Sequence, residues 1–339
     1  MPSSNWLSPG AIFLMIALVC GCGKSPNLPD TPASHSHNPD NIIASGGISQ
    51  FFARNLVYRF DEDIVTEMPT LDADIRMIKS GDPFVPGNAN DFVVDIHRCD
   101  LGIDKASLEA IFNKYVFNFE GSPLSNLTFT FLDNRVKLAG KMKKGFLTIA
   151  FEAEGPILPN GSGQVVLRPD TIRANGVKVT NLMGLMGMDI ATFINMRQDS
   201  GLRIDGNDVV IYPNRLLPPP AIRGFVQTVT VNKRLMVLGF NDRVVRTVPP
   251  LPDPAARNWL LFYGGDVMLA NTLMKDAKVQ MVDTTPQDPM YYYMPLYKEQ
   301  MVAGTMRYTM KGETISYVPD IKGTHFSLPD VQSQSKVYR

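Results

Sequence analysis

The sequence predicts a mainly β fold with two α-helices, in the α+β class, followed by a β-rich C-terminal region. Apolar and polar residues alternate over most of the chain after Gly46, which is typical of half-buried antiparallel strands. Only residues 105–117 and 181–196 place apolar side chains at helical spacing. A hydrophobic content of 44% with 19% charged residues belongs to a folded globular protein.

The first element is an apolar run over residues 11–19 that leads into Cys20-Gly21-Cys22. The run is too short to cross a bilayer, which takes about 20 apolar residues. With the small residue Gly21 just before Cys22, the segment resembles a bacterial lipoprotein signal peptide. The resemblance implies that residues 1–21 are removed and that Cys22 is lipidated. An uncleaved transmembrane helix or a buried core helix is the alternative.

Lipidation of Cys22 would attach several acyl chains, such as palmitate, and more than one chain gives stable anchoring. The implied location is the bacterial cell envelope, anchored by lipid to the outer membrane, with the periplasmic and surface sides both open. Gly23, rather than Asp, follows the cysteine, which resembles the arrangement that permits export to an outer membrane. Residues 22–45 are rich in Pro, Ser and Asn, so we expect a flexible tether there.

The charges of the chain balance, with 33 Lys and Arg against 33 Asp and Glu. Binding to nucleic acid needs clustered basic residues, so no nucleic-acid partner is expected. Lys141, Lys143 and Lys144 surround Met142, and we expect a solvated turn there. The chain has no Gly-rich phosphate loop, no His-Glu-x-x-His and no Cys-x-x-Cys. We therefore expect no catalytic residue, metal or cofactor, and a carboxylate-only hydrolase is the less favoured alternative.

Two pairs of polar residues nevertheless stand two positions apart on predicted strands. Cys99 is expected to be a small buried core residue, but His97 would share its strand face, so a thiol nucleophile is the alternative. Asp72 and Asp74 share a face in the same way. A pair of carboxylates suits acid–base chemistry, but ordinary surface placement is favoured.

The first predicted helix begins after Asp104, a suitable N-cap, and spans residues 105–117. Strands are expected at 127–131 and 146–154, and in the second of these Leu147, Ile149, Phe151 and Ala153 share one face. A hairpin is expected at 203–211, with its turn at Gly206 and Asn207. Residues 216–220 form a rigid polyproline crossover. The remaining predicted strands are 225–231, 235–240, 259–263, 267–270, 278–282, 300–308 and 314–318.

The second predicted helix, residues 181–196, is apolar around nearly its whole circumference, which indicates burial on most sides. It is also rich in methionine, a pliable side chain common on surfaces that accommodate varied apolar partners. The alternative is that these methionines fill an irregular core.

Residues 101–240 resemble the LmeA-like, TULIP-related phospholipid-binding proteins of bacterial envelopes. The parallel consists of a helix at 107–116, successive strands with Gly-rich turns, the segment 176–179 leading into the second helix, and the hairpin 201–210. The resemblance implies a long curved antiparallel sheet packed on helices, with an apolar groove for acyl chains and no catalytic residues. Residues 46–100 and those after Pro254 have no counterpart in it.

The expected organisation is a signal peptide (1–21), a tether (22–45), a β-rich body (46–248), a β-rich C-terminal region (249–330) and a tail (331–339). We expect a membrane-anchored protein that holds a phospholipid or another apolar molecule between sheet and helices. The expected lining residues are Leu182, Met183, Leu185, Met186, Ile190, Phe193, Ile194, Phe129, Phe131, Leu147, Ile149 and Phe151.

The alternative function is a non-catalytic structural lipoprotein with a dry core. Such a protein would contact an envelope protein partner through its aromatic C-terminal region, since tyrosine is enriched at interfaces. The residues expected at that surface are Tyr291, Tyr292, Tyr293 and Tyr297.

Overall fold

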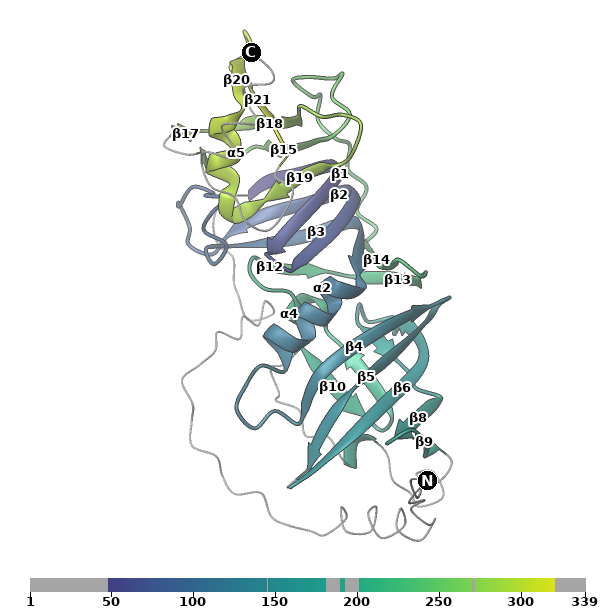
Figure 1. Ribbon diagram of the computed structural model, residues 1–339. Helices are drawn as coiled ribbons and strands as arrows, with labels where there is room; N and C mark the ends of the chain where they lie inside the picture. The colour runs from purple at the N-terminus through teal and green to yellow at the C-terminus, as the bar shows by residue number, and fades with distance from the viewer. Residues whose placement is uncertain (1–47, 145, 181–189, 193–200, 270–271, 321–339) are drawn as a thin grey trace, which may run out of the picture.

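A computed structural model describes residues 48–144, 146–180, 190–192, 201–269 and 272–320. The chain forms an elongated molecule in which a larger sheet and a smaller sheet are joined by a short helical segment (Figure 1). The prediction of a mainly β protein is confirmed. Most of the predicted helix 181–196 lies outside the described residues, and only the 3-10 turn Ile190–Thr192 is described within it.

The larger sheet is built on an antiparallel meander of three long strands, β1 (Ile48–Asp61), β2 (Ile64–Met77) and β3 (Phe92–Asp104). The strand order is β13-β14-β3-β2-β1-β15-β18-β21-β20. The flanking strands are β13 (Val226–Val231), β14 (Leu235–Asn241), β15 (Trp259–Tyr263), β18 (Lys278–Asp283), β20 (Thr305–Tyr308) and β21 (Thr314–Val318). Two further strands pair in parallel, β12 (Ala221–Gly224) with β3 and β19 (Met290–Tyr293) with β1. Strands on either side of the expected boundary at residue 248 therefore share one sheet.

The smaller sheet contains the strands on which the predicted groove was placed. Its order is β10-β11-β7-β6-β5-β4, with β8 paired to β6 and β9 paired to β8. The strands are β4 (Leu124–Leu132), β5 (Arg135–Lys144), β6 (Leu147–Pro159), β7 (Val165–Leu167), β8 (Thr171–Ala174), β9 (Val177–Lys178), β10 (Leu202–Asp205) and β11 (Asp208–Ile211). The hairpin predicted at 203–211 is confirmed as β10 and β11, and Gly206 takes a φ of 61° at its turn. A separate hairpin joins β16 (Val267–Leu269) to β17 (Thr272–Met274).

The helix predicted at 105–117 is confirmed, as α2 (Lys105–Ala110) continued by the π-helix η2 (Ile111–Val116). Asp104 is its N-cap, because its Oδ1 accepts the backbone N–H of Ser107 at 2.7 Å.

The same helix satisfies backbone groups of both sheets. The Ser107 hydroxyl accepts the N–H of Val65 on β2 at 3.0 Å. On β4, the edge strand of the smaller sheet, the side-chain amide of Asn113 accepts the N–H of Leu127 at 2.9 Å and donates to its carbonyl at 2.7 Å. Glu109 accepts the N–H of Phe129. Covering an edge in this way removes unpaired strand groups from solvent.

Two predicted elements differ from the structure. The strand expected at 300–308 begins only at Thr305, because residues 297–303 form the helix α5 (Tyr297–Ala303), preceded by the 3-10 turn η4 (Met294–Leu296). Tyr297 and Met301 stand one helical turn apart and are both buried. The expected polyproline segment starts one residue later than predicted, since Leu216 closes the short helix α4 (Pro213–Leu216) and Leu217 is the first extended residue.

We predict that Asn113→Ala lowers the free energy of unfolding by about 2 kcal/mol, because it leaves the N–H and the carbonyl of Leu127 without partners. Equilibrium unfolding in urea measures the change. Lys114→Ala, on the exposed side of the same helix, is the matched control and should change stability by less than about 0.5 kcal/mol. Equal losses in the two variants would show that the edge contact contributes nothing specific.

Candidate functional site

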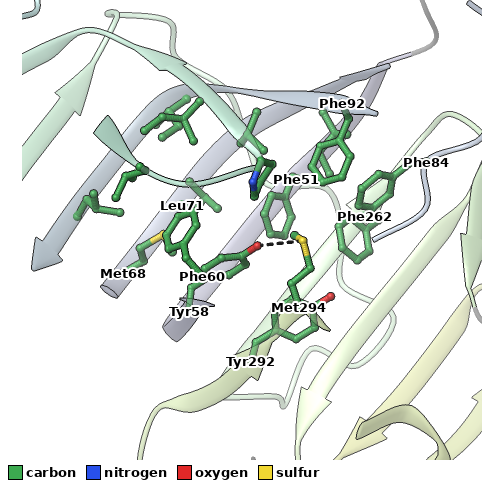
Figure 2. Close-up of a pocket in the computed structure, with 17 residues that line it drawn as sticks. Phe51, Tyr58, Phe60, Met68, Leu71, Phe84, Phe92, Phe262, Tyr292 and Met294 are labelled. Carbon is green, nitrogen blue, oxygen red and sulfur yellow. Dashed lines mark hydrogen bonds between the residues drawn. The ribbon is translucent and has the colours of Figure 1, made fainter. Parts of the chain in front are cut away.

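An apolar cavity of about 40 Å³ lies on the inner face of the larger sheet. Strands β1, β2 and β3 form its floor (Figure 2). The rest of the lining comes from β12, β15 and β19, which pair with β3 or β1 in the same sheet, and from η4 and the segment around Leu217. The lining residues are Phe51, Tyr58, Phe60, Met68, Leu71, Ile75, Phe84, Phe92, Val94, Ile96, Leu101, Leu217, Pro220, Ile222, Phe262, Tyr292 and Met294. All of these are buried except Phe60 and Leu217, which are half-buried. These two side chains are therefore the parts of the lining that reach toward solvent.

Strand alternation explains why this face is apolar. On β2 the side chains of Leu71, Ala73, Ile75 and Met77 are buried together, and on β3 those of Phe92, Val94 and Ile96 are. Seven aromatic rings surround the cavity, several of them in contact. Phe51 stacks on Phe262 with ring centroids 5.0 Å apart, and Phe84 meets Phe92 edge to face at 4.9 Å. These contacts make one wall of the cavity rigid, since offset and edge-to-face pairs favour a defined geometry.

Two phenol groups supply the polar atoms at one end of the cavity. The Tyr58 hydroxyl donates to the sulfur of Met294 at 3.4 Å (Figure 2). The Tyr292 hydroxyl is buried and has no hydrogen-bond partner among the described residues. Burial raises the pKa of each phenol well above the ordinary value of a tyrosine. For Tyr58 the electrostatic effect of Tyr292 raises the pKa further, by a smaller amount. Both hydroxyls therefore stay protonated and can act as hydrogen-bond donors.

A second apolar cavity, of about 30 Å³, lies between the smaller sheet and the helix α2–η2. Its lining includes Leu108 and Phe112 from the helix, and Phe129 from β4. The two cavities follow one another along β3, because Leu101 lines the first and Ile103, two positions on, lines the second. Leu217 belongs to the first lining and Leu216 to the second. This pair of leucines is thus the partition between them.

The predicted groove residues fall in several places. Leu182, Met183, Leu185, Met186, Phe193 and Ile194 lie outside the described residues. Ile190 is buried in a small cluster with Ile172 and Val179, separate from the main core. Phe129 and Phe131 are buried in the main core, and only Phe129 lines a cavity. Leu147, Ile149 and Phe151 are half-buried toward one end of β6.

The larger cavity was missed by the sequence reasoning, since most of its lining comes from residues 51–101 and from the C-terminal region. Three of the four tyrosines expected at an interaction surface are buried, with Tyr292 and Tyr297 each 2% exposed and Tyr293 8% exposed. Tyr292 lines the cavity instead. The signal that could have located it is the number of aromatic residues on β1 and β19, of which Phe51, Tyr58, Phe60 and Tyr292 line it.

The outer face of the same strands carries a cluster of charged side chains. Asp72 and Asp74 point away from the cavity and flank the guanidinium of Arg246, whose Nε lies 2.9 Å from Asp72 and whose NH1 lies 2.5 Å from Asp74. The Arg246 guanidinium also stands over the ring of Phe52 at 5.4 Å. Its pKa is raised: burial alone would lower it, but the hydrogen bonds and charges of the two carboxylates outweigh that effect. The expected surface carboxylate pair is thus occupied by an arginine.

His97 belongs to this outer cluster, not to the core beside Cys99. Its Nδ1 lies 2.5 Å from Asp242 and its Nε2 lies 3.2 Å from Asp74. The register of β2 against β3 shifts between Asp72 and Ala73, which places one extra residue on β3. This bulge ends the alternation on which the His97–Cys99 pairing was based. Burial is the largest cause that raises the pKa of Cys99, so its thiol stays protonated.

The pKa of Asp242 is lowered. Burial alone would raise it, but the hydrogen bonds from His97 and from the backbone of Val244, with the charges of His97 and Arg246, outweigh burial. The cluster therefore behaves as a set of compensated charges that holds the segment after β14 against the sheet. Among the described residues no three His, Cys, Asp or Glu side chains are grouped to hold a metal ion. Within the same part of the chain, no helix has the length and apolar character needed to cross a bilayer.

These features define the class of site as an apolar cavity with two phenol donors in a two-sheet protein. Comparison of the chain with family models, with curated proteins and with solved structures finds no match.

We predict that Arg246→Met lowers the free energy of unfolding by about 2 kcal/mol, because among the described residues it leaves the mostly buried carboxylate of Asp72 without a cation and leaves Asp74 with only Arg76 and His97. Urea unfolding at neutral pH measures the loss. The matched control is Arg168→Met, which removes an exposed pair with Asp208 and should cost less than about 1 kcal/mol. A stability of Arg246→Met equal to that of the control would overturn the structural role given to this cluster.

Proposed function

We propose that this protein binds an apolar ligand, such as the acyl chain of a phospholipid, along the inner face of the larger sheet. The observation that carries the proposal is the cavity over β1–β3, whose lining is apolar apart from two phenol hydroxyls and whose buried phenol Tyr292 has no partner within the described residues. Ligand pockets are typically apolar clefts with a few polar groups that fix orientation. The proposal also includes the expectation that residues 101–240 resemble phospholipid-binding proteins of bacterial envelopes.

The cavity volume sets a condition on binding. About 40 Å³ is close to the share of one water molecule in the liquid, about 30 Å³, and is too small for a chain of several carbons. Entry of a ligand therefore requires side chains to move. Met68 and Met294 line the cavity and are unbranched, so they can change conformation at low cost. Half-buried Phe60 packs edge to face on Tyr58 with centroids 4.6 Å apart and would swing outward at the mouth.

The length of the ligand follows from the second cavity. Displacement of the Leu216–Leu217 partition would join the two cavities into one apolar channel along β3, which both linings share. Each buried methylene of the ligand would contribute about 0.8 kcal/mol. The Tyr292 hydroxyl would donate to an ester or carboxyl oxygen at one end of the ligand. Such a channel would correspond to the apolar groove, beside a curved antiparallel sheet, that was expected from the sequence.

The anchor predicted at Cys22 fits this function and is part of the proposal. A lipid chain on Cys22 would hold the folded body near a membrane, and a tether of residues 22–45 would let the body reach the bilayer surface. A ligand drawn from that bilayer would then need no passage through bulk water.

We predict that Leu71→Phe abolishes ligand binding without loss of stability. The larger side chain fills the cavity, and filling a cavity is neutral or stabilising. Binding of a fluorescent palmitate analogue to the full chain should weaken at least tenfold, while the urea midpoint stays the same or rises. Phe60→Ala should instead speed association of the same probe, because it widens the mouth.

The matched control is Leu138→Phe, which fills the second cavity. A short-chain probe that fills only the first cavity should bind this variant as it binds the parent chain, since the Leu216–Leu217 partition separates the second cavity from the first. If the parent chain neither binds the probe nor yields lipid on organic extraction and mass spectrometry, the core is dry and the proposal fails. Equal weakening in the two variants would place the ligand outside the cavity.

A further inference from the structure

The tip of the β5–β6 hairpin carries an exposed aromatic side chain beside basic residues. Phe146 is 92% exposed, and Lys141 and Lys143 are exposed on one face of β5. Met142 and Leu147, on the other face, are half-buried. The tip is thus amphipathic, with lysines on one side, apolar residues on the other and a phenylalanine at the apex.

The lysines of the tip face uncharged neighbours. Lys141 lies opposite Ser125 on β4 and Ala150 on β6, and Lys143 lies opposite Thr148. Within the described part of the chain no carboxylate forms an ion pair with either lysine. Further along β5 the pattern changes, because Lys137 lies opposite Glu154. Lys141 and Lys143 thus have no facing carboxylate on the neighbouring strands.

The position of the tip leaves it free to meet a flat surface. The other end of the β4–β5 hairpin is held to the larger sheet, where the N–H of Asn134 donates to the carbonyl of Val231 at 2.9 Å. The end of β5 that carries Lys143 points away from the larger sheet (Figure 1). Beside it the β8–β9 turn, joined to β6 by the bond from Asn175 N–H to the carbonyl of Ala150, exposes Val177 and Lys178. A second element at this end thus repeats the combination of an apolar and a basic side chain.

We propose that this tip docks on a bilayer that contains anionic phospholipid, with Phe146 inserted at the interface and Lys141 and Lys143 against the phosphates. Aromatic rings are favoured at membrane interfaces, and basic residues are attracted to anionic headgroups. A protein partner would need a pocket shaped to fit the single ring of Phe146. A bilayer needs no such pocket, because the ring can insert between lipids and the lysines can meet phosphate groups in many arrangements. Docking here does not depend on what occupies the cavity.

The test uses the full chain with Cys22→Ser in every sample, so that no attached lipid contributes. Partition onto phosphatidylcholine vesicles with and without phosphatidylglycerol is measured by co-sedimentation. Phe146→Ala should weaken partition onto the anionic vesicles about tenfold. Lys141→Gln and Lys143→Gln should each weaken it about fivefold and should have little effect with phosphatidylcholine alone.

Met310→Ala and Lys311→Gln are the matched controls, since both residues are exposed on the larger sheet's side of the molecule and should leave partition unchanged. Phe146→Trp gives a second, site-specific measurement: the difference spectrum against the parent should shift to the blue when anionic vesicles are added. Equal effects in tip and control variants, or a tryptophan at 146 that stays in water, would overturn the proposal. Capture of another macromolecule by the tip without vesicle binding would overturn it as well.

Discussion

The structure depends on one short helix that hydrogen-bonds to strands of two sheets. Ser107 accepts an N–H from β2 of the larger sheet, while Asn113 and Glu109 satisfy β4 of the smaller one. Backbone groups buried without partners are costly, so the helix must lie where it can reach both β2 of the larger sheet and the edge strand β4 of the smaller one. Its apolar side chains, among them Ile111 and Phe112, are thereby placed over the second cavity or in the core beside it. The helix thus joins two sheets into one apolar interior instead of leaving two separate domains.

The larger sheet is covered on both faces, by apolar side chains on the inner face and by a cluster of charged side chains on the outer face. Its inner face carries aromatic and aliphatic side chains around the cavity, and its outer face carries the Asp72, Asp74 and Arg246 cluster with the ring of Phe52. The charges hold the segment after β14 against the sheet, and that segment leads into β15, which pairs with β1. The cavity wall formed by Phe262 on β15 is therefore positioned in part by ion pairs on the opposite face. A site whose described lining carries no charged side chain depends in this way on charged residues that do not line it.

The residue pattern predicted those elements that are determined by interactions between residues close in sequence. The Asp104 cap, the helix after it and the Gly206 turn each depend on a few consecutive residues, and each is confirmed. The bulge at His97 was missed because it arises from the register between β2 and β3, which strand alternation alone does not reveal. The helix at 297–303 was missed because its Gln300 side chain donates to the carbonyls of Tyr291 and Pro319, partners distant in sequence. The cavity was missed for the same reason, since β1 and β15 are some two hundred residues apart, as the 203-residue separation of the Asn55–Asn258 contact illustrates.

The number of hydrogen bonds that hold each part of the lining indicates where the cavity can open. The floor is made of β1, β2 and β3, whose ladders run continuously over most of their length, so moving it would break many hydrogen bonds at once. The partition is a single segment between α4 and β12, and Leu217 within it is extended and half-buried. Phe60, at the end of β1, faces the mouth next to the register shift between Arg59 and Asp61. Opening is therefore least costly along the line from Phe60 to Leu217, and a ligand that entered there would meet the phenols of Tyr58 and Tyr292 at one end and the leucine partition at the other.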